Sequence, residues 1–353
     1  MLLGCHDISP HVAPFLHDVL RKHGKTCVSW LGPTPKVTIV DPSLAKEVMS
    51  NKFGHFEKLR FPALSMLLAK GVADYAGQKW AKHRRILNPA FHLEKLKVSL
   101  TGDVISRIAF GSSYLDGREI FQLQSEQAER LLTNLKKIII PGYTFLPTRN
   151  NRRMHQINRK IESILRTLTE KRMKAMQEGE STKDDLLGLM LHSSMTATNE
   201  NSQSIPGMTI EEVTMILYEV LWLYPPAITF IRKTCKDMKI GGIAYPAGVL
   251  IELPVLFIHH DLEIWGNDAL EFNPERFVEG ISKASKDAGA FLPFGWGPRV
   301  CIGQQFVLLE AKMAMCMSLQ HFEFSLAQAY THAPHNVTFL RPMHGAQIKL
   351  CAI

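Results

Sequence analysis

The chain has 353 residues, 46% of them hydrophobic and 21% charged, an ordinary globular composition that allows one large domain or two. Its net charge of +8 suits an anionic membrane, an acidic protein or nucleic acid, and does not choose among them. No apolar run approaches the ~20 residues of a membrane-spanning helix. The six cysteines have neither disulfide-framework nor zinc-site spacing, so a reducing compartment is the simpler expectation.

The first part of the chain is predicted to be mainly helical. Residues 36–50 read as a short strand, a turn at Asp41-Pro42 and then a helix. Apolar side chains recur at helical spacing further on, and helices are predicted over residues 77–87, 123–139, 149–180 and from 208 onward. The polar residues 193–206 are predicted to form a loop.

After Pro225-Pro226 the pattern changes to short strands. Residues 238–253 alternate and turn at Gly241-Gly242, which predicts a hairpin. Residues 303–322 form a helix that is apolar nearly all round, and the helix is therefore predicted to be buried. Further strands are expected over residues 322–326, 337–340 and 346–350. The expected fold class is mainly α with small β-sheets, an α+β protein without internal repeats.

The segment FLPFGWGPRVCIG, residues 291–303, carries the strongest functional signal. Cys301 precedes a helix whose free N–H groups and dipole favour a thiolate. The glycines let the backbone approach a flat object closely, and Arg299 offers a fork for a carboxylate. A lone cysteine beside a helix is usually a buried core thiol. This combination instead describes a haem-thiolate site.

Five residues of this segment fill the pattern F-x-x-G-x-R-x-C-x-G: Phe294, Gly297, Arg299, Cys301 and Gly303. The pattern resembles the haem-binding signature of the cytochrome P-450 family. The resemblance implies that haem b is the cofactor, that Cys301 is its axial iron ligand and that Arg299 pairs with a propionate. It also implies that Phe294 shields the sulfur and that Gly297 and Gly303 let the loop lie against the porphyrin.

Two further stretches fit the same family. Trp80 and Arg84 match its W-x-x-x-R pattern, in which both side chains share a helix face and reach the haem propionates. The alternative is a surface tryptophan that packs against an arginine stem. Arg232 stands where the family commonly places another propionate-binding arginine, and the alternative is a solvated arginine at a strand end. His259-His260 are not expected to bind a metal, because adjacent side chains point ~100° apart on a helix.

The sequence departs from the family pattern in several places. Trp222 replaces the arginine of the E-x-x-R motif, which leaves Glu219 dependent on Arg276 of the P-E-R-F box for a partner. Segments that the family carries are missing at the joins 97/98 and 213/214, among them the central distal helix with its A-G-x-[DE]-T motif. The N-terminal membrane anchor is also missing. Residues 1–353 are therefore expected to form a single truncated P-450 domain in which neighbouring elements keep uncovered apolar faces.

The resemblance implies haem-dependent monooxygenation of a small apolar substrate, with electrons from an NADPH-dependent reductase. Sequences such as HGAQIKL are similar to the plant branch containing secologanin synthase, which implies a terpenoid substrate and plant secondary metabolism. Lys79, Lys82 and Arg85 are candidates for the reductase contact, and a merely solvated face is the alternative.

No nucleic-acid partner is expected. The family implies membrane association at the endoplasmic reticulum, whereas the chain as written would be cytosolic or peripheral. The alternative function is a catalytically inactive, misfolded remnant that at most binds haem. No catalytic residue is assigned, because the family's distal acid–alcohol pair is absent from the sequence.

Overall fold

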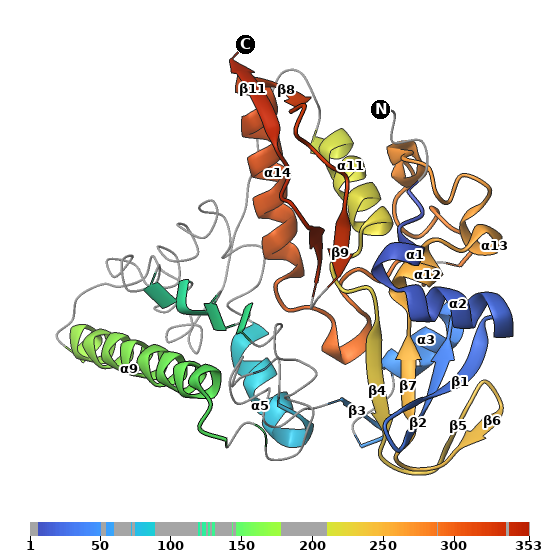
Figure 1. The fold of residues 1–353 in the computed structure, drawn as a ribbon, viewed down its shortest axis with the longest axis horizontal. Helices are drawn as coiled ribbons and strands as arrows, with labels where there is room; N and C mark the ends of the chain where they lie inside the picture. Colours follow the sequence, from blue (N-terminus) through green and yellow to red (C-terminus); the bar gives the residue numbers. More distant parts are fainter. Residues whose placement is uncertain are drawn as a thin grey trace. The chain divides into compact units, whose positions relative to one another are not determined.

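The computed structural model describes residues 6–50, 54–59, 72, 75–88, 119–120, 122–124, 126–127, 129–130, 143, 146–177, 210–287, 289–336 and 339–352. Contacts between residues divide the chain into two compact units, residues 1–59 with 203–353 and residues 60–202 (Figure 1). Helices and small sheets make up both the N-terminal and the C-terminal parts of the first unit, as the predicted fold class requires. The prediction of a single domain stays a prediction.

A five-stranded sheet forms the centre of the first unit, with the strand order β1-β2-β7-β4-β3. Its strands are β1 (Thr26–Leu31), β2 (Thr34–Ile39), β3 (Phe56–Lys58), β4 (Phe230–Thr234) and β7 (Leu250–Leu253). Strands β2 and β7 pair in parallel and the other neighbours pair antiparallel. All four residues of β7 are buried, because this strand lies between two others in the middle of the sheet.

Helices and short turns surround this sheet. They are α1 (Ser9–Val12), α2 (Pro14–His23), α3 (Pro42–Ser50), α11 (Ile210–Leu223), α12 (Val255–His259), α13 (Leu262–Trp265), η5 (Pro274–Phe277), η6 (Gly297–Arg299) and α14 (Gln304–His321). The core contains fully buried side chains from strands and helices alike, for example Ile39, Leu253 and Trp222. Burying apolar side chains of this size stabilises a fold by about 1.5–3 kcal/mol each.

Three two-stranded sheets complete the first unit. They are β5 (Met238–Ile240) with β6 (Ile243–Tyr245), β8 (Phe322–Leu326) with β11 (Ile348–Ala352), and β9 (Pro334–Asn336) with β10 (Leu340–Pro342). The first is the predicted hairpin, and Gly241 and Gly242 supply the positive φ values of its turn. Strand β8 has the predicted bounds, whereas β11 begins two residues later than predicted. Residues 337–338 of the remaining predicted strand lie outside the described residues.

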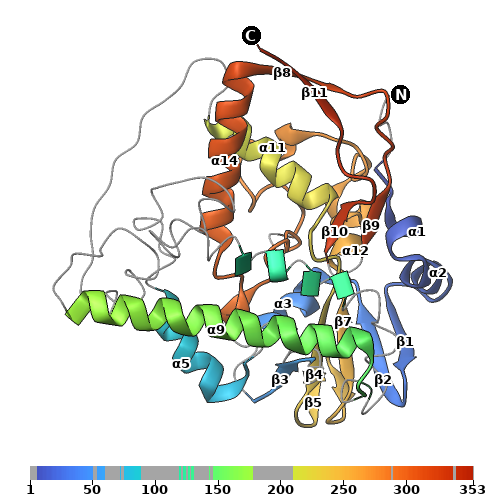
Figure 2. The same ribbon diagram turned by 60° about the vertical axis from the view of Figure 1, so that its left-hand side comes forward.

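The predicted burial of helix α14 is wrong. Among its described side chains only Leu308 is buried, and Val307 is 43% exposed. Among the described elements, the helix packs mainly against α11 and β8 (Figure 2). An open cavity of about 340 Å³ lies over Ala314, Met315, Ser318, Leu319 and Phe324. An apolar sequence predicts burial only where a partner covers every face of the helix.

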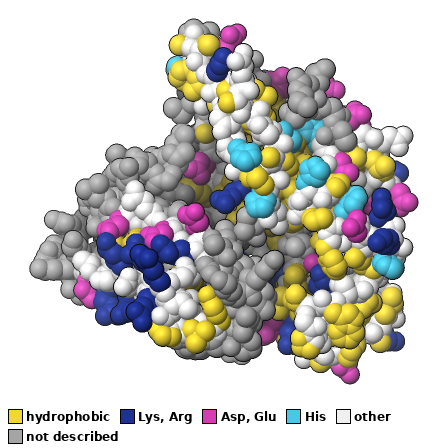
Figure 3. All heavy atoms as spheres, in the orientation of Figure 1, with side chains coloured by type: hydrophobic (Ala, Val, Ile, Leu, Met, Phe, Trp, Pro, Cys, Tyr) yellow, Lys and Arg dark blue, Asp and Glu magenta, His cyan; other side chains and the backbone are white. Residues whose placement is uncertain are grey.

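The described part of the second unit includes the helices α5 (Gly77–Leu87) and α9 (Arg149–Gln177), with nearly the predicted bounds. Helix α9 buries Met154 and Ile157, while Lys and Arg side chains gather on its surface (Figure 3). Within the predicted helix 123–139, the described residues 123–124, 126–127 and 129–130 are helical and the others lie outside the described part, as does the predicted loop 193–206. No helix in the described part of the chain is long and apolar enough to cross a membrane.

Candidate functional site

The cysteine loop, residues 291–303, leads into the first turn of α14 and folds back on itself. The Cys301 amide donates to the Phe294 carbonyl over 2.9 Å, and the Gly295 amide donates to the Leu292 carbonyl over 3.0 Å. These bonds hold Cys301 at the helix start with an exposed side chain and no disulfide partner. A buried core thiol, the alternative for this cysteine, does not describe the structure.

A buried histidine, which sequence reasoning did not single out for this role, anchors the start of the loop. Burial lowers the pKa of His259 to about 3, so the ring is neutral. Its Nδ1 donates to the Trp222 carbonyl at 2.9 Å and its Nε2 accepts from the Leu292 amide at 3.0 Å. His260 Nε2 bonds instead to the Leu223 carbonyl. The two adjacent imidazoles thus bond to different backbone groups. The sequence shows only that His259 and His260 are adjacent, and this does not reveal their backbone contacts.

Gly297 is required by a close contact with helix α3. The residue has a φ of +70°, and a Cβ there would lie 2.5 Å from the Met49 carbonyl oxygen. The turn η6 therefore presses on the last turn of α3, a constraint that the sequence pattern did not reveal. At Gly303, by contrast, the nearest atom to a built Cβ is the Cys301 sulfur at 4.0 Å. The implied porphyrin contacts of both glycines stay predictions.

Arg232 and Arg299 place two positive charges close together near the cysteine loop. Arg232, on β4, is only 9% exposed, so it is not the solvated strand-end residue of the alternative interpretation. Burial, and then repulsion from Arg299, lower the pKa of Arg232 to about 10. Within the described residues, no carboxylate pairs with Arg232, whose side chain donates from Nη1 to the Ile231 carbonyl.

A buried guanidinium without a counter-ion is costly, and an anion beside Arg232 and Arg299 would offset that cost. A flat cofactor that carries two carboxylates and takes a thiolate ligand fits this set of residues. Arg299 makes further contacts of its own, whereas Arg232 is the arginine without a described carboxylate partner.

Trp80 and Arg84 lie one turn apart on α5, in the second unit. The Trp80 side chain is 4% exposed, so it is not a surface tryptophan. Arg84 Nε donates to Asn88 Oδ1 at 2.7 Å. Trp80 and Arg84 each make further interactions. Their implied contact with the propionates stays a prediction. Beside them Lys79, Lys82 and Arg85 are exposed, and the Lys79 ammonium lies 4.0 Å over the Tyr75 ring.

The predicted pairing of Glu219 with Arg276 is confirmed. Arg276 Nε lies 3.5 Å from Glu219 Oε2, and both side chains are buried. The Arg276 guanidinium also stacks 4.2 Å over the Trp222 ring and bonds Asp268 at 3.0 Å. Trp222 therefore keeps a favourable contact with the same arginine, although its own Nε1 has no hydrogen-bond partner.

The pairing around Glu219 is incomplete. Its Oε1 accepts from the Asn273 amide at 2.8 Å, but Oε2 makes no hydrogen bond. Burial raises the pKa of Glu219 to about 7 in spite of Arg276. A carboxyl group with this pKa carries only a fractional charge at neutral pH, which reduces the cost of burying it.

The described residues contain no cluster of three His, Cys, Asp or Glu side chains that could hold a metal ion. The exposed Cys301 thiol on this closed loop, near the buried guanidinium of Arg232, suits a metal that is held within a cofactor and takes one protein ligand. Together with the small sheets and surrounding helices, these features define a haem-thiolate protein.

Comparison with known proteins agrees. The sequence model described as Cytochrome P-450 matches residues 5–101 and 208–350. Cytochrome P-450 CYP72A616 of Paris polyphylla is 44% identical, with 98% of this chain and 85% of that relative covered. Cytochrome P-450 72A15 of Arabidopsis thaliana is 40% identical, with 97% and 84% covered. The chain belongs to the cytochrome P-450 family.

A solved structure confirms the predicted fold class. Retinoic acid bound cyanobacterial CYP120A1 is similar with a TM-score of 0.75 at 18% identity, over 97% of this chain and 94% of that one. At this identity the similarity shows the fold alone. Proteins of the family hold haem b through a cysteine thiolate, catalyse monooxygenation and receive electrons from a redox partner.

Proposed function

We propose that Cys301 is the axial haem ligand of this chain, and that Arg232 and Arg299 bind the haem propionates. The observation that carries the proposal is the buried Arg232 guanidinium, whose pKa is depressed and which has no carboxylate partner in the described part of the chain. Phe294 supports the sulfur side, since its carbonyl accepts from the Cys301 amide. Trp80 and Arg84, which share one helix face, would also bind propionate.

The bound haem would supply the activation of O2 for insertion of one oxygen atom into a small apolar substrate of the terpenoid class. The resemblance to terpenoid-oxidising plant proteins supports this substrate class. An NADPH-dependent reductase would deliver the electrons at the face carrying Lys79, Lys82 and Arg85, which are exposed as such a contact requires. We place this activity at the endoplasmic reticulum membrane, in line with the expectation for the family.

A second candidate function is haem binding without turnover. The alignment with CYP72A616 extends over 441 residues whereas this chain has 353, so at least 88 positions of that relative lack a counterpart. The sequence contains no A-G-x-[DE]-T motif, which provides the distal acid–alcohol pair in the family. Loss of internal segments is therefore part of the proposal, and it favours a chain that binds haem but does not oxidise a substrate.

Haem reconstitution tests both candidates. The purified chain is loaded with haem, reduced and exposed to carbon monoxide, and the Soret band is recorded for the wild type, Cys301→Ala and Cys351→Ala. Cys351 is the matched control because it is also free and exposed. We expect a thiolate-type red-shifted band that only Cys301→Ala abolishes.

A red-shifted band that survives in Cys301→Ala would refute the ligand assignment. Product formation from terpenoid substrates with a reductase present then separates the two candidates. Oxidised product from the wild type supports the monooxygenase, and a red-shifted band without product supports the haem-binding remnant.

A further inference from the structure

A cavity of about 770 Å³ lies in the second unit at the start of helix α9. It is lined by Arg130, Arg149, Asn150, Arg152, Arg153 and Gln156. The haem-binding proposal uses none of these residues. Four of the six side chains are guanidinium groups, and the volume is within the range of small-molecule sites.

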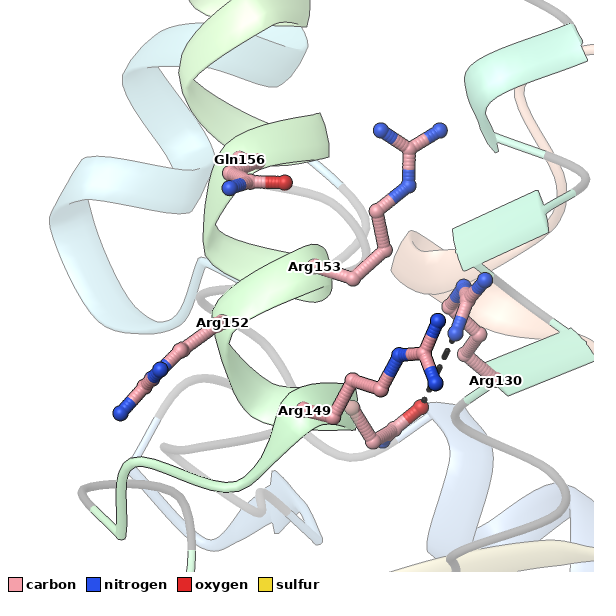
Figure 4. A pocket seen from close by; sticks show the side chains of 6 residues that line it. Arg130, Arg149, Arg152, Arg153 and Gln156 are labelled. Carbon is pink, nitrogen blue, oxygen red and sulfur yellow. Dashed lines mark hydrogen bonds between the residues drawn. The ribbon is translucent and has the colours of Figure 1, made fainter.

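Three of the arginines project to one side of the helix. In Figure 4, Arg149 extends toward Arg130, and Arg153 leaves the next turn on the same side. Arg152, which lies three residues after Arg149, extends in the opposite direction. The convergent groups are therefore Arg130, Arg149 and Arg153.

One carboxylate only partly balances these three charges. Glu126 binds Arg153 through both of its oxygens, at 2.9 and 2.7 Å, and binds Arg130 at 2.9 Å. These bonds hold the pKa of Glu126 at about 2, so this residue is fully ionised. Arg149 has no carboxylate partner within the part of the chain that the structure describes. Among the described residues, three guanidinium groups thus face one carboxylate, and Arg149 keeps an unpaired charge.

The position of these charges on the helix is unfavourable without an anion. Arg149, Arg152 and Arg153 lie in the first turns of α9, and the first turn contains no acidic residue. The N-terminal end of a helix carries partial positive charge, which opposes cations and favours anions. Arginine forks that converge beside a helix N-terminus form an arrangement that binds phosphate groups.

We propose that this arginine cavity binds a small anion that carries several adjacent phosphate groups. The unpaired Arg149 fork, with the positive charges of Arg130 and Arg153 beside it, suits a multiply charged ligand that presents phosphate oxygens on more than one group. Such a ligand can come from solution, as a free polyphosphate, or from a membrane, as a phosphorylated lipid headgroup.

Binding of inorganic tripolyphosphate to the full-length chain, measured by isothermal titration, tests the proposal. Arg149→Gln is expected to weaken binding roughly tenfold or more, because it removes charge-assisted hydrogen bonds to the ligand. Arg152→Gln removes the same charge from the same turn but outside the convergent group. It is therefore expected to weaken binding less than about threefold, since exposed charges are screened over short distances.

Two further measurements keep the test independent of folding defects. Arg149→Lys keeps the charge but loses the fork, so its affinity should lie between those of the wild type and Arg149→Gln. Without ligand, Arg149→Gln should unfold at a temperature equal to or above that of the wild type, because a cation leaves the helix N-terminus.

Vesicles distinguish the source of the ligand. Binding to free tripolyphosphate identifies a soluble ligand, and binding only to vesicles containing phosphatidylinositol 4,5-bisphosphate identifies a lipid headgroup, provided that Arg149→Gln weakens either one. Equal losses in Arg149→Gln and Arg152→Gln would overturn the proposal, because net charge alone would then explain them. Absence of binding to either ligand, or equally tight binding of citrate, would also overturn it.

Discussion

The central sheet and the C-terminal region of the first unit contain the same kinds of residue but bury them to very different degrees. Leu253 of β7 is fully buried, whereas Leu350 of β11 is 52% exposed. The pairing register of β8 and β11 puts six apolar side chains on one face of this two-stranded sheet: Phe322, Phe324, Leu326, Ile348, Leu350 and Ala352. The opposite face carries Glu323, Ser325, Lys349 and Cys351. The β8–β11 sheet is thus amphipathic, and its apolar face stays largely exposed.

The difference shows that a pattern of apolar residues specifies a face, while the neighbouring elements decide whether that face is buried. Strand β7 has neighbours on both sides within its sheet. Strands β8 and β11 pair only with each other, and α14 covers part of one face at Phe324. Exposed apolar patches of this kind mark either an interface or a liability to aggregate.

A matched pair of leucine substitutions tests this comparison most directly. Leu253→Ala should lower the free energy of unfolding by about 2–5 kcal/mol, because it leaves a cavity in a packed core. Leu350→Ala makes the same chemical change on an exposed strand, and it should cost less than about 1 kcal/mol. Urea unfolding followed by circular dichroism measures both. Equal losses of unfolding free energy in the two variants would mean that the β8–β11 sheet is buried in solution. The contrast between the two regions would then be lost.

The buried carboxyl of Glu219 sharpens the comparison, because this core residue lies in the helix that packs against α14. Its pKa is raised from 4.5 to about 7, so the folded state binds its proton more tightly than the unfolded state. The corresponding stability is fully present below pH 4.5 and is lost as the pH rises through 7. The loss amounts to about 3 kcal/mol. In Glu219→Gln this part of the pH dependence should disappear.

Urea unfolding of the wild type and Glu219→Gln at a series of pH values from 5 to 8 makes the measurement. Asp268→Asn is a useful second variant, since its negative charge contributes to the raised pKa of Glu219. It should move the wild-type transition to lower pH. The same change in the free energy of unfolding between pH 5 and 8 in the wild type, Glu219→Gln and Asp268→Asn would contradict the assignment.

Two glycines of the cysteine loop, one packed on the core and one at the start of α14, give a smaller contrast. Gly297→Ala should destabilise the chain by about 1–3 kcal/mol, because φ is +70° and the new Cβ would lie 2.5 Å from the Met49 carbonyl. Gly303→Ala should cost less than about 1 kcal/mol, since its φ of −85° suits any residue. Thermal unfolding measures stability, and the reaction rate of the Cys301 thiol with a small reagent reports displacement of the loop. A reaction rate that is unchanged in Gly297→Ala would show that η6 absorbs the strain without moving Cys301.

Much of the fold could be predicted from local patterns. Helix α5 and strand β8 have the predicted bounds, because their apolar spacing and end signals lie within a few residues of each other. The turn at Gly241-Gly242 is equally local. The burial of α14 could not be predicted, because an apolar sequence carries no information on which neighbours are present.

The candidate site divides in the same way. The cysteine loop was recognisable from five residues within a stretch of ten, because its chemistry is encoded locally. The contact of Gly297 with Met49, and the hydrogen bond from the Leu292 amide to His259, join segments far apart in the sequence. The pairing of Glu219 with Arg276 was predictable only because the missing arginine at position 222 directed attention to an alternative partner.

The parallel pairing of β2 with β7 joins segments that are separated by about 210 residues. Closing a loop of that length has an entropic cost that grows only with the logarithm of the number of residues. Adding roughly 90 residues to the intervening segment would change this cost by about 0.3 kcal/mol. The sheet that supports the cysteine loop is therefore almost indifferent to the length of the chain between its strands. During synthesis the β1–β2 pair can form early, but its sheet cannot be completed until residues 250–253 of β7 have been made, whatever lies between.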